Sequence, residues 1–249
     1  MLIISDGLEG RCAILTLDRP KALNALNGEL LDAFDAALDA VEADEGKRAV
    51  IIAGKGRAFC AGADLKESGI DAIARVERIH TLMLRLLDFP KIIVAAIDGF
   101  ALGGGLELAM ACSFRVASPA SALGLPEIRM NLIPGYGGTQ MLPRLIGAAR
   151  AVEMILDGQP ISAARALEIG LITAMSAEGE PVLDAALALA ARYSRHGPEA
   201  QHAARRAIWR GAGLSIEDGL RLERELVSEV ARSKAAQAGV ASFRETGRN

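Results

Sequence analysis

Apolar residues follow two different patterns along this chain, and the change between them falls near residue 180. Before that point, short apolar runs rich in β-branched residues alternate with amphipathic stretches. The expected strands are 13–17, 49–53, 91–97 and 114–117, and the expected helices are 30–41, 70–87 and 106–112. Apolar residues at 31, 34, 38 and 41 recur at helical spacing and predict one buried helix face. Strands that alternate with helices predict an α/β core.

After residue 180 the pattern is helical only. Helices are expected over 183–193, 198–210 and 215–241, with breaks at Gly197-Pro198 and at 211–213. A helical end of this kind needs another surface to pack on. We therefore expect residues 1–180 to form the α/β core with the functional site, and residues 181–249 to form a separate helical region.

A run of three glycines, 103–105, stands between the predicted strand 91–97 and the predicted helix 106–112. Glycines let the backbone approach a ligand closely, and amide N–H groups at a helix start favour negative charge. Glu107 follows in the first helical turn, and its carboxylate is expected to point back over the same amides. The pattern predicts an acid or base beside an oxyanion donor. Two alternatives stay open: Glu107 as a helix cap, and the glycines as a dinucleotide-binding turn, although no G-x-G-x-x-G follows.

A second turn of small residues follows the predicted strand 49–53. It runs through Ala61-Gly62-Ala63 and then a predicted helix start at Asp64. Two such turns can each direct one N–H at a single carbonyl oxygen, which is the usual construction of an oxyanion hole. Ala63 and Gly104 are the candidate donors. The alternative is a tight loop in which Asp64 is an ordinary N-cap.

Glu127 is a second candidate carboxylate. It follows Pro126 in the segment 124–128, which we expect to be a loop or a short extended piece. An isolated glutamate in a loop usually faces water, and this remains the alternative. Two carboxylates around one small site would repel each other and share one proton, so their titrations would be coupled.

Five segments in order carry a resemblance to a known family. They are RPKALNAL at 19–26, CAGADLKE at 60–67, ALGGGLE at 101–107, LPEI at 125–128 and IPGYGGTQ at 133–140. The chain resembles the enoyl-CoA hydratase/isomerase (crotonase) superfamily over nearly its whole length, and it is most similar to the enoyl-CoA hydratases. The resemblance implies an α/β spiral of repeated strand-strand-helix units. It also implies that the C-terminal helices build a homotrimer or a dimer of trimers.

The resemblance also implies roles for individual residues. The amides of Ala63 and Gly104 would hold the thioester oxygen of a coenzyme A ester and its enolate. Glu107 and Glu127 would handle water and a proton, and the Gly135 amide would help to hold the water. The residues that would line the coenzyme A path are Lys21, Ala22, Leu23, Ala61, Asp64, Leu65 and Lys66. Coenzyme A is then part of the substrate, and no separate cofactor or metal is expected.

The C-terminus departs from the family pattern. A phenylalanine that matches Phe243 is followed in many members by a basic cluster near the adenosine end of coenzyme A, sometimes from a neighbouring subunit. Here the following residues are RETGR, so the cluster is reduced and Arg248 is the candidate substitute. Arg19, Lys21 and Lys66 are further candidates for contact with the phosphates.

Two glutamates favour reversible hydration of a trans-2-enoyl-CoA. A carboxylate at 127 alone would indicate a Δ3,Δ2-enoyl-CoA isomerase, which stays the alternative, ahead of a decarboxylase or a thioester hydrolase. A non-catalytic acyl-CoA-binding or RNA-binding scaffold is opposed by the glutamate pair and by the acidic net charge. The acyl chain and the assignment of acid and base to the two glutamates stay open. Fatty-acid β-oxidation is the expected setting, with amino-acid and aromatic-acid breakdown as alternatives.

Composition narrows the function classes further. The net charge of −3 disfavours nucleic-acid binding, and no run reaches the about 18 uncharged apolar residues of a membrane span. The N-terminus lacks a signal or transit pattern, so a cytoplasmic protein without membrane partners is expected. The cysteines at 12, 60 and 112 fit neither a disulfide framework nor a zinc site and are expected to be buried thiols. The histidines at 80, 196 and 202 lie outside the motifs, which disfavours Ser-His-Asp or metal chemistry.

Overall fold

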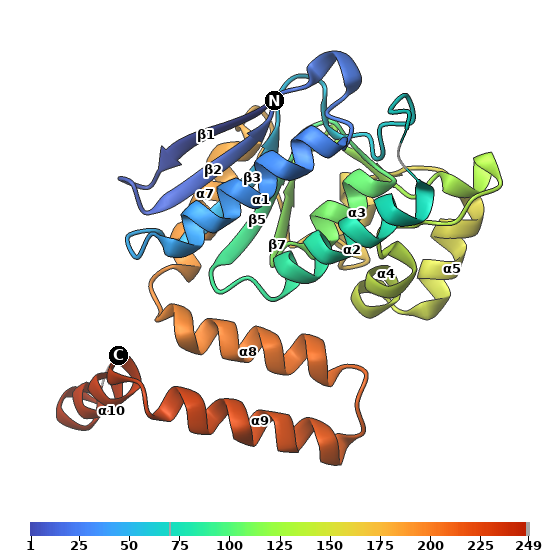
Figure 1. Cartoon of the computed structure of the whole chain (residues 1–249). Helices are drawn as coiled ribbons and strands as arrows, with labels where there is room; N and C mark the ends of the chain where they lie inside the picture. The colour runs from blue at the N-terminus through green and yellow to red at the C-terminus, as the bar shows by residue number, and fades with distance from the viewer. Residues whose placement is uncertain (70, 248–249) are drawn as a thin grey trace.

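A six-stranded sheet forms the centre of the protein in the computed structural model, which describes residues 1–69 and 71–247 (Figure 1). In sheet order its strands are β1 (Leu2–Gly7), β2 (Cys12–Leu17), β3 (Ala49–Gly54), β5 (Ile92–Ile97), β7 (Phe114–Ala117) and β10 (Ala174–Met175). β1 is antiparallel to β2, and the other neighbours are parallel. The four strands expected from the sequence are all present in this sheet.

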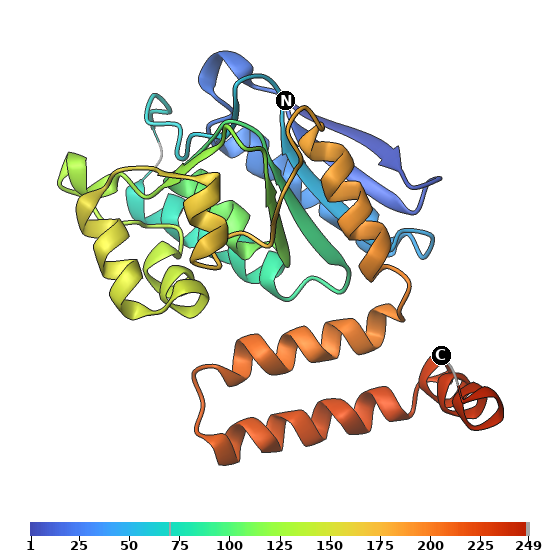
Figure 2. The ribbon, with the colours of Figure 1, turned by 180° about the vertical axis from the view of Figure 1, so that it is seen from behind.

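Both faces of this sheet are covered by helices. On one face lie α1 (Gly28–Ala43), α2 (Ala72–Leu87) and α3 (Gly104–Ala111), and on the other lies α7 (Val182–Tyr193), seen from behind in Figure 2. Alternate strand residues point to opposite faces. Leu15 and Ile52 accordingly pack with α1 to α3, whereas Ile14 and Ile51 pack with α7. Burial on both faces explains why these strands are continuous apolar runs.

A second, smaller sheet is formed by strands that follow strands of the first sheet along the chain. Its order is β4 (Ala58–Cys60), β6 (Phe100–Leu102), β8 (Ala122–Gly124) and β9 (Ile161–Ser162), with the first three parallel. In the chain β4 follows β3, β6 follows β5 and β8 follows β7, and helices α2, α3 and α4 (Gly138–Ile146) come next. The expected spiral of strand-strand-helix units is confirmed. The remaining core elements are η1 (Pro20–Ala22), η2 (Glu127–Met130), α5 (Ala148–Asp157) and α6 (Ala163–Glu168).

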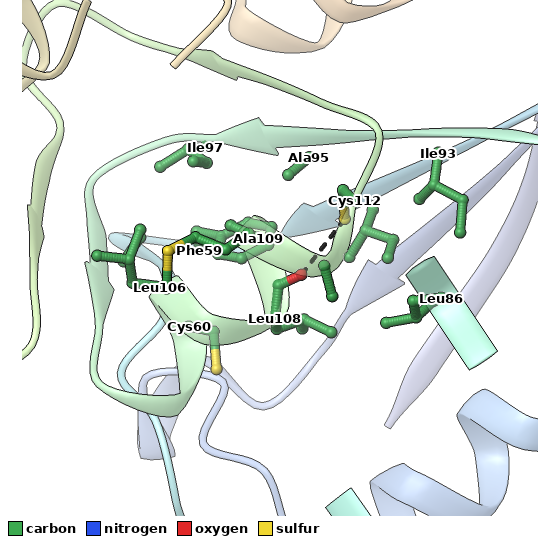
Figure 3. Packing of buried hydrophobic residues seen from close by; sticks show 14 of the residues in the cluster. Phe59, Cys60, Leu86, Ile93, Ala95, Ile97, Leu106, Leu108, Ala109 and Cys112 are labelled. Atoms are coloured by element: carbon green, nitrogen blue, oxygen red, sulfur yellow. Dashed lines mark hydrogen bonds between the residues drawn. The ribbon is translucent and has the colours of Figure 1, made fainter. Parts of the chain in front are cut away.

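Helix α3 lies in the middle of the core with every residue buried (Figure 3). It begins two residues earlier than expected, at Gly104. A Cβ on Gly105 would lie 2.0 Å from the carbonyl oxygen of Cys60, so only glycine allows this approach of helix to strand. The three cysteines are free thiols, as expected, and burial raises the pKa of Cys60 and of Cys112 to about 12.

Local signals set the starts of the long helices. The Asn27 side chain accepts from the Leu30 N–H and caps α1. The Asp71 side chain likewise accepts from Ile73 and Ala74 and starts α2, whose expected first residue, Ile70, lies outside the described residues. In the described parts of the chain, no helix combines the length and the apolar character that a membrane crossing requires.

The last three helices extend away from the sheets (Figures 1 and 2). They are α8 (Pro198–Gly211), α9 (Ile216–Ala231) and α10 (Lys234–Thr246). The single helix expected over 215–241 is wrong, because the Ser233 hydroxyl accepts from the Ala236 N–H and starts a new helix. His202 and Arg205 of α8 donate to the carbonyl oxygens of Asp88 and Phe89. The predicted division into a core of residues 1–180 and a helical region of residues 181–249 stays a prediction. Helix α7 covers one face of the sheet, whereas α8 to α10 extend away from it.

Candidate active site

The segments that follow β4, β6 and β8 meet at one edge of the second sheet. Together with the turn 133–138 they enclose a cavity of about 180 Å³, which we name the front cavity. Parallel strands bring their carboxyl ends to the same edge, so three segments far apart in the sequence are placed side by side. The five residues predicted to be catalytic all line the front cavity: Ala63, Gly104, Glu107, Glu127 and Gly135.

Two backbone amides are free to donate into this cavity. Leu26 bridges to the segment around Ala63 by accepting from the Asp64 N–H and donating to the Gly62 carbonyl, which leaves the Ala63 N–H unused. Gly104 is the first residue of α3. Within residues 1–69 and 71–247, neither the Ala63 N–H nor the Gly104 N–H has an acceptor. A Cβ on Gly62 would lie 3.1 Å from the Gly104 nitrogen, so the two turns touch, and Ala63 and Gly104 line the same cavity.

Glu107 is buried, with 1% of its surface exposed. Its Oε1 accepts from the Tyr136 N–H at 2.8 Å and from the Gly138 N–H at 2.7 Å. These contacts tie Glu107 to the turn 136–138 and show that it is not a cap of its own helix. Glu107 lines the front cavity together with Gly103 and Gly104, and its position over their amides stays a prediction. Burial raises the pKa of Glu107 to about 7, and the Glu127 carboxylate adds to the rise, against the lowering effect of the two N–H groups.

Glu127 begins the short helix η2, where a loop or extended piece was expected. Its Oε2 is buried and, in the described residues, has no hydrogen-bond partner. Burial also raises the pKa of this carboxyl group. A Cβ on Gly103, whose φ is 51°, would lie 2.7 Å from Glu127 Oε1. The side chain thus lies directly against the glycine turn, with one oxygen left for a ligand, and differs from a solvated loop glutamate.

The residues of the expected coenzyme A path lie beside one another. Ala61 and Leu65 line the front cavity, and the Leu23 carbonyl accepts from the Ala61 N–H at 3.0 Å. This bond places η1, with Lys21 and Ala22, alongside the segment 61–66. Lys21 and Lys66 are exposed at this surface.

Asp64 and Arg19 differ from expectation. No helix starts at Asp64; its side chain accepts from the Lys66 N–H at 3.1 Å and pairs with Arg19 at 2.7 Å. The Arg19 hydrogen bond is the main reason that the pKa of Asp64 is lowered. Arg19 was a candidate for contact with the phosphates of coenzyme A. In the structure it instead connects its own turn to the turn of Asp64 through this ion pair.

Phe243, the described C-terminal candidate, is not brought to the front cavity within one chain. Phe243 lies on α10 with 55% of its surface exposed, beyond α9. Figure 1 shows α10 at the end of the molecule away from α2 and α3. The other candidate at this end, Arg248, lies outside the described residues.

Two further residues at the site were missed by sequence reasoning. Tyr136 donates its backbone N–H to Glu107, and its ring lies against Gly104. His80 donates from Nε2 to the carbonyl oxygen of Gly135 at 2.8 Å and so fixes the same turn. For Tyr136, the available sequence signal was its position inside the motif at 133–140. For His80 the sequence carries no such signal, because its contact with Gly135 depends on how α2 packs in the folded chain.

A spiral that presents two free amides beside two carboxylates has the arrangement of an enzyme that polarises a carbonyl group. The chain belongs to the enoyl-CoA hydratase/isomerase family, whose model matches residues 8–249. A relative from Bacillus subtilis (strain 168), named "Probable enoyl-CoA hydratase", is 41% identical over 98% of this chain and 96% of its own. The 2,3-dehydroadipyl-CoA hydratase of Escherichia coli (strain K12) is 37% identical over 97% of this chain and 94% of its own.

A solved structure agrees with the fold. The crystal structure of an enoyl-CoA hydratase from Bacillus anthracis superposes with a TM-score of 0.89 at 36% identity, covering 98% of this chain and 96% of that one. The agreement extends over both the spiral and the C-terminal helices, since almost the whole of each chain is covered.

The raised pKa of Glu107 predicts a pH-dependent stability. Well below pH 4.5 this carboxyl is neutral in the folded and unfolded chains alike. As the pH rises through 4.5 towards about 7, the unfolded chain loses its proton first, so the folded state loses stability. Relative to Glu107→Gln, which keeps the acceptor oxygen and cannot titrate, the wild type should lose about 3 kcal/mol of unfolding free energy between pH 4 and pH 8.

Urea unfolding at a fixed protein concentration over this pH range measures the difference. The control is Glu77→Gln on the exposed surface of α2, whose stability should run parallel to that of the wild type. Parallel curves for Glu107→Gln as well would contradict the buried, proton-retaining state of Glu107.

Proposed function

We propose that the protein is an enoyl-CoA hydratase that adds water reversibly to a trans-2-enoyl-CoA and gives a 3-hydroxyacyl-CoA. The observation that carries the proposal is the meeting of two unpartnered amides and two carboxylates around one cavity. The names of the relatives, hydratases of coenzyme A esters, support the same reaction.

The amides of Ala63 and Gly104 supply the electrostatic part of the mechanism. When both donate to the thioester oxygen, the conjugated β-carbon becomes electrophilic and negative charge collects on the oxygen as water adds. The donors bind most strongly in that enolate state, and losing one such donor typically costs about 3–4 kcal/mol of transition-state stabilisation. The amide pair is then the largest catalytic contribution.

Glu107 and Glu127 supply the acid–base part. Hydration needs a base for the water and an acid for the α-carbon, which one protonated and one ionised carboxyl provide. A Glu107 pKa of about 7, raised by burial and by Glu127, keeps one proton on the pair near neutral pH. The two groups titrate as a pair, so the roles belong to the pair. The Gly135 amide, in the turn fixed by His80, helps to hold the water.

Coenzyme A is proposed to lie along η1 and the segment 61–66, with Lys21 and Lys66 on the phosphate side. Phe243 is too remote from the front cavity of its own chain, so we propose that it acts on a neighbouring subunit. The cytoplasmic location and the β-oxidation setting stay predictions.

The absorbance of crotonyl-CoA tests the function. The wild type should destroy the conjugated thioester, whereas Glu107→Gln and Glu127→Gln should each lower kcat about 100-fold to 10,000-fold with little change in KM, because neutral isosteres keep the packing and lose the proton transfer. Glu77→Gln, exposed on α2, is the matched control and should retain full activity.

The same assay separates the alternative functions. Gain of conjugation from a 3-enoyl-CoA, without loss from crotonyl-CoA, would identify an isomerase, the other reaction in the family's description. A glutamate variant with normal turnover would remove that residue from the mechanism.

We also propose that the C-terminal helices assemble the chain into a trimer or a dimer of trimers. Ile216, Leu220 and Val227 on α9 are all exposed large apolar side chains, which a partner would cover. Sedimentation equilibrium should give a mass that is three or six times the 26.1 kDa of one chain. A monomer mass at micromolar concentration would contradict this assembly.

A further inference from the structure

A second cavity of about 140 Å³ lies behind the front cavity, and we name it the rear cavity. Its apolar wall is formed by Leu26, Leu31, Ala74 and Ile79. At its polar end stands the ion pair of Arg75 with Glu67, at 3.2 Å. None of these residues was assigned a role in the proposed reaction.

Tyr136 is the residue that lines both cavities. A Cβ on Gly104 would lie 2.5 Å from Cδ2 and 2.7 Å from Cε2 of this ring, so one ring edge rests on the glycine turn of the front cavity. Burial raises the pKa of the Tyr136 hydroxyl. Tyr136 also lines the rear cavity together with Arg75 and Glu67, so it stands between the oxyanion turn and that cavity.

The position of the ring determines where an acyl chain can go. With its thioester oxygen on Ala63 and Gly104, a substrate places its α- and β-carbons between Glu107 and Glu127. Leu65 on the coenzyme A side is 70% exposed, so the front cavity is open there. The Tyr136 ring stands against Gly104, where the carbons beyond the double bond would continue inward.

We propose that Tyr136 determines acyl-chain specificity: its side chain closes the inner end of the front cavity, restricts the enzyme to short acyl chains, and shuts off the rear cavity. The proposal rests on the proposed function, since it takes the front cavity as the site of an enoyl thioester. Removing the ring should join the two cavities into one apolar tunnel that ends at the Arg75–Glu67 pair.

The test is the ratio of kcat/KM for trans-2-decenoyl-CoA to that for crotonyl-CoA. Tyr136→Ala should raise this ratio about tenfold or more, because each further buried methylene favours the long chain. Tyr136→Phe keeps the ring and should leave the ratio unchanged. Tyr136→Leu opens less space and should raise the ratio by a smaller factor. It replaces Tyr136→Ala in the experiment if that variant does not fold.

A second substitution, in the wall of the rear cavity, should reverse the effect of Tyr136→Ala. Ala74 is exposed on α2, lines the rear cavity and lies outside the front cavity, so a larger side chain there should fill the rear cavity from outside. Ala74→Phe alone should not change crotonyl-CoA turnover. Added to Tyr136→Ala, it should return the chain-length ratio to the wild-type value.

Binding of saturated esters separates this proposal from the proposed function. Calorimetry gives the affinity ratio of decanoyl-CoA to butyryl-CoA without any turnover, and Tyr136→Ala should raise that ratio as well. A raised affinity ratio in a protein that does not hydrate crotonyl-CoA would overturn the hydratase function and uphold the role of Tyr136. An unchanged ratio in both assays would overturn the role of Tyr136, and the chain would then run outward past Leu132 and Ile133, which are exposed at the rim.

Discussion

The close approach of helix α3 to the end of strand β4 is the constraint on which the site depends. Gly105 packs so tightly on the Cys60 carbonyl that no Cβ fits between them, and a Cβ on Gly62 would lie only 3.1 Å from the first nitrogen of the helix. Because α3 is buried along its whole length, this contact cannot relax toward solvent. Two amides from segments about forty residues apart are therefore held near one point, without side chains between them.

The same burial determines the electrostatics of the helix. At its C-terminal end, the buried Arg115 guanidinium donates to the carbonyl oxygens of Ala109, Met110 and Cys112, and so adds positive charge and hydrogen bonds where carbonyl groups of the helix end. At its N-terminal end, the amide of Gly104 is left for a ligand. Glu107 in the first turn must share this buried setting, so it retains a proton more readily than an exposed carboxylate and relies on the turn 136–138 for its contacts.

Local patterns predicted the parts of this arrangement that are local. The apolar runs gave the strands, and the glycine turns after 49–53 and 91–97 gave Ala63 and Gly104, because both features lie within one stretch of chain. The partners of Glu107, the Arg19–Asp64 pair and the place of Tyr136 between two cavities were not predicted, since each joins segments that only the folded chain brings together. The helix break at Ser233 was missed because a single serine cap interrupts an otherwise continuous helical pattern. The roles of Glu127 and Gly135 came from the family resemblance.

The most direct test of the oxyanion site is the infrared carbonyl stretch of butyryl-CoA, labelled with carbon-13 at the thioester carbon, when bound to the wild-type protein. Two N–H donors on one oxygen weaken the C=O bond, so the stretch should move to lower frequency than in free butyryl-CoA, and the shift should persist in Glu127→Gln, which leaves both amides in place. A bound ester whose stretch equals that of the free ester would contradict the account, because its oxygen would then lie away from Ala63 and Gly104.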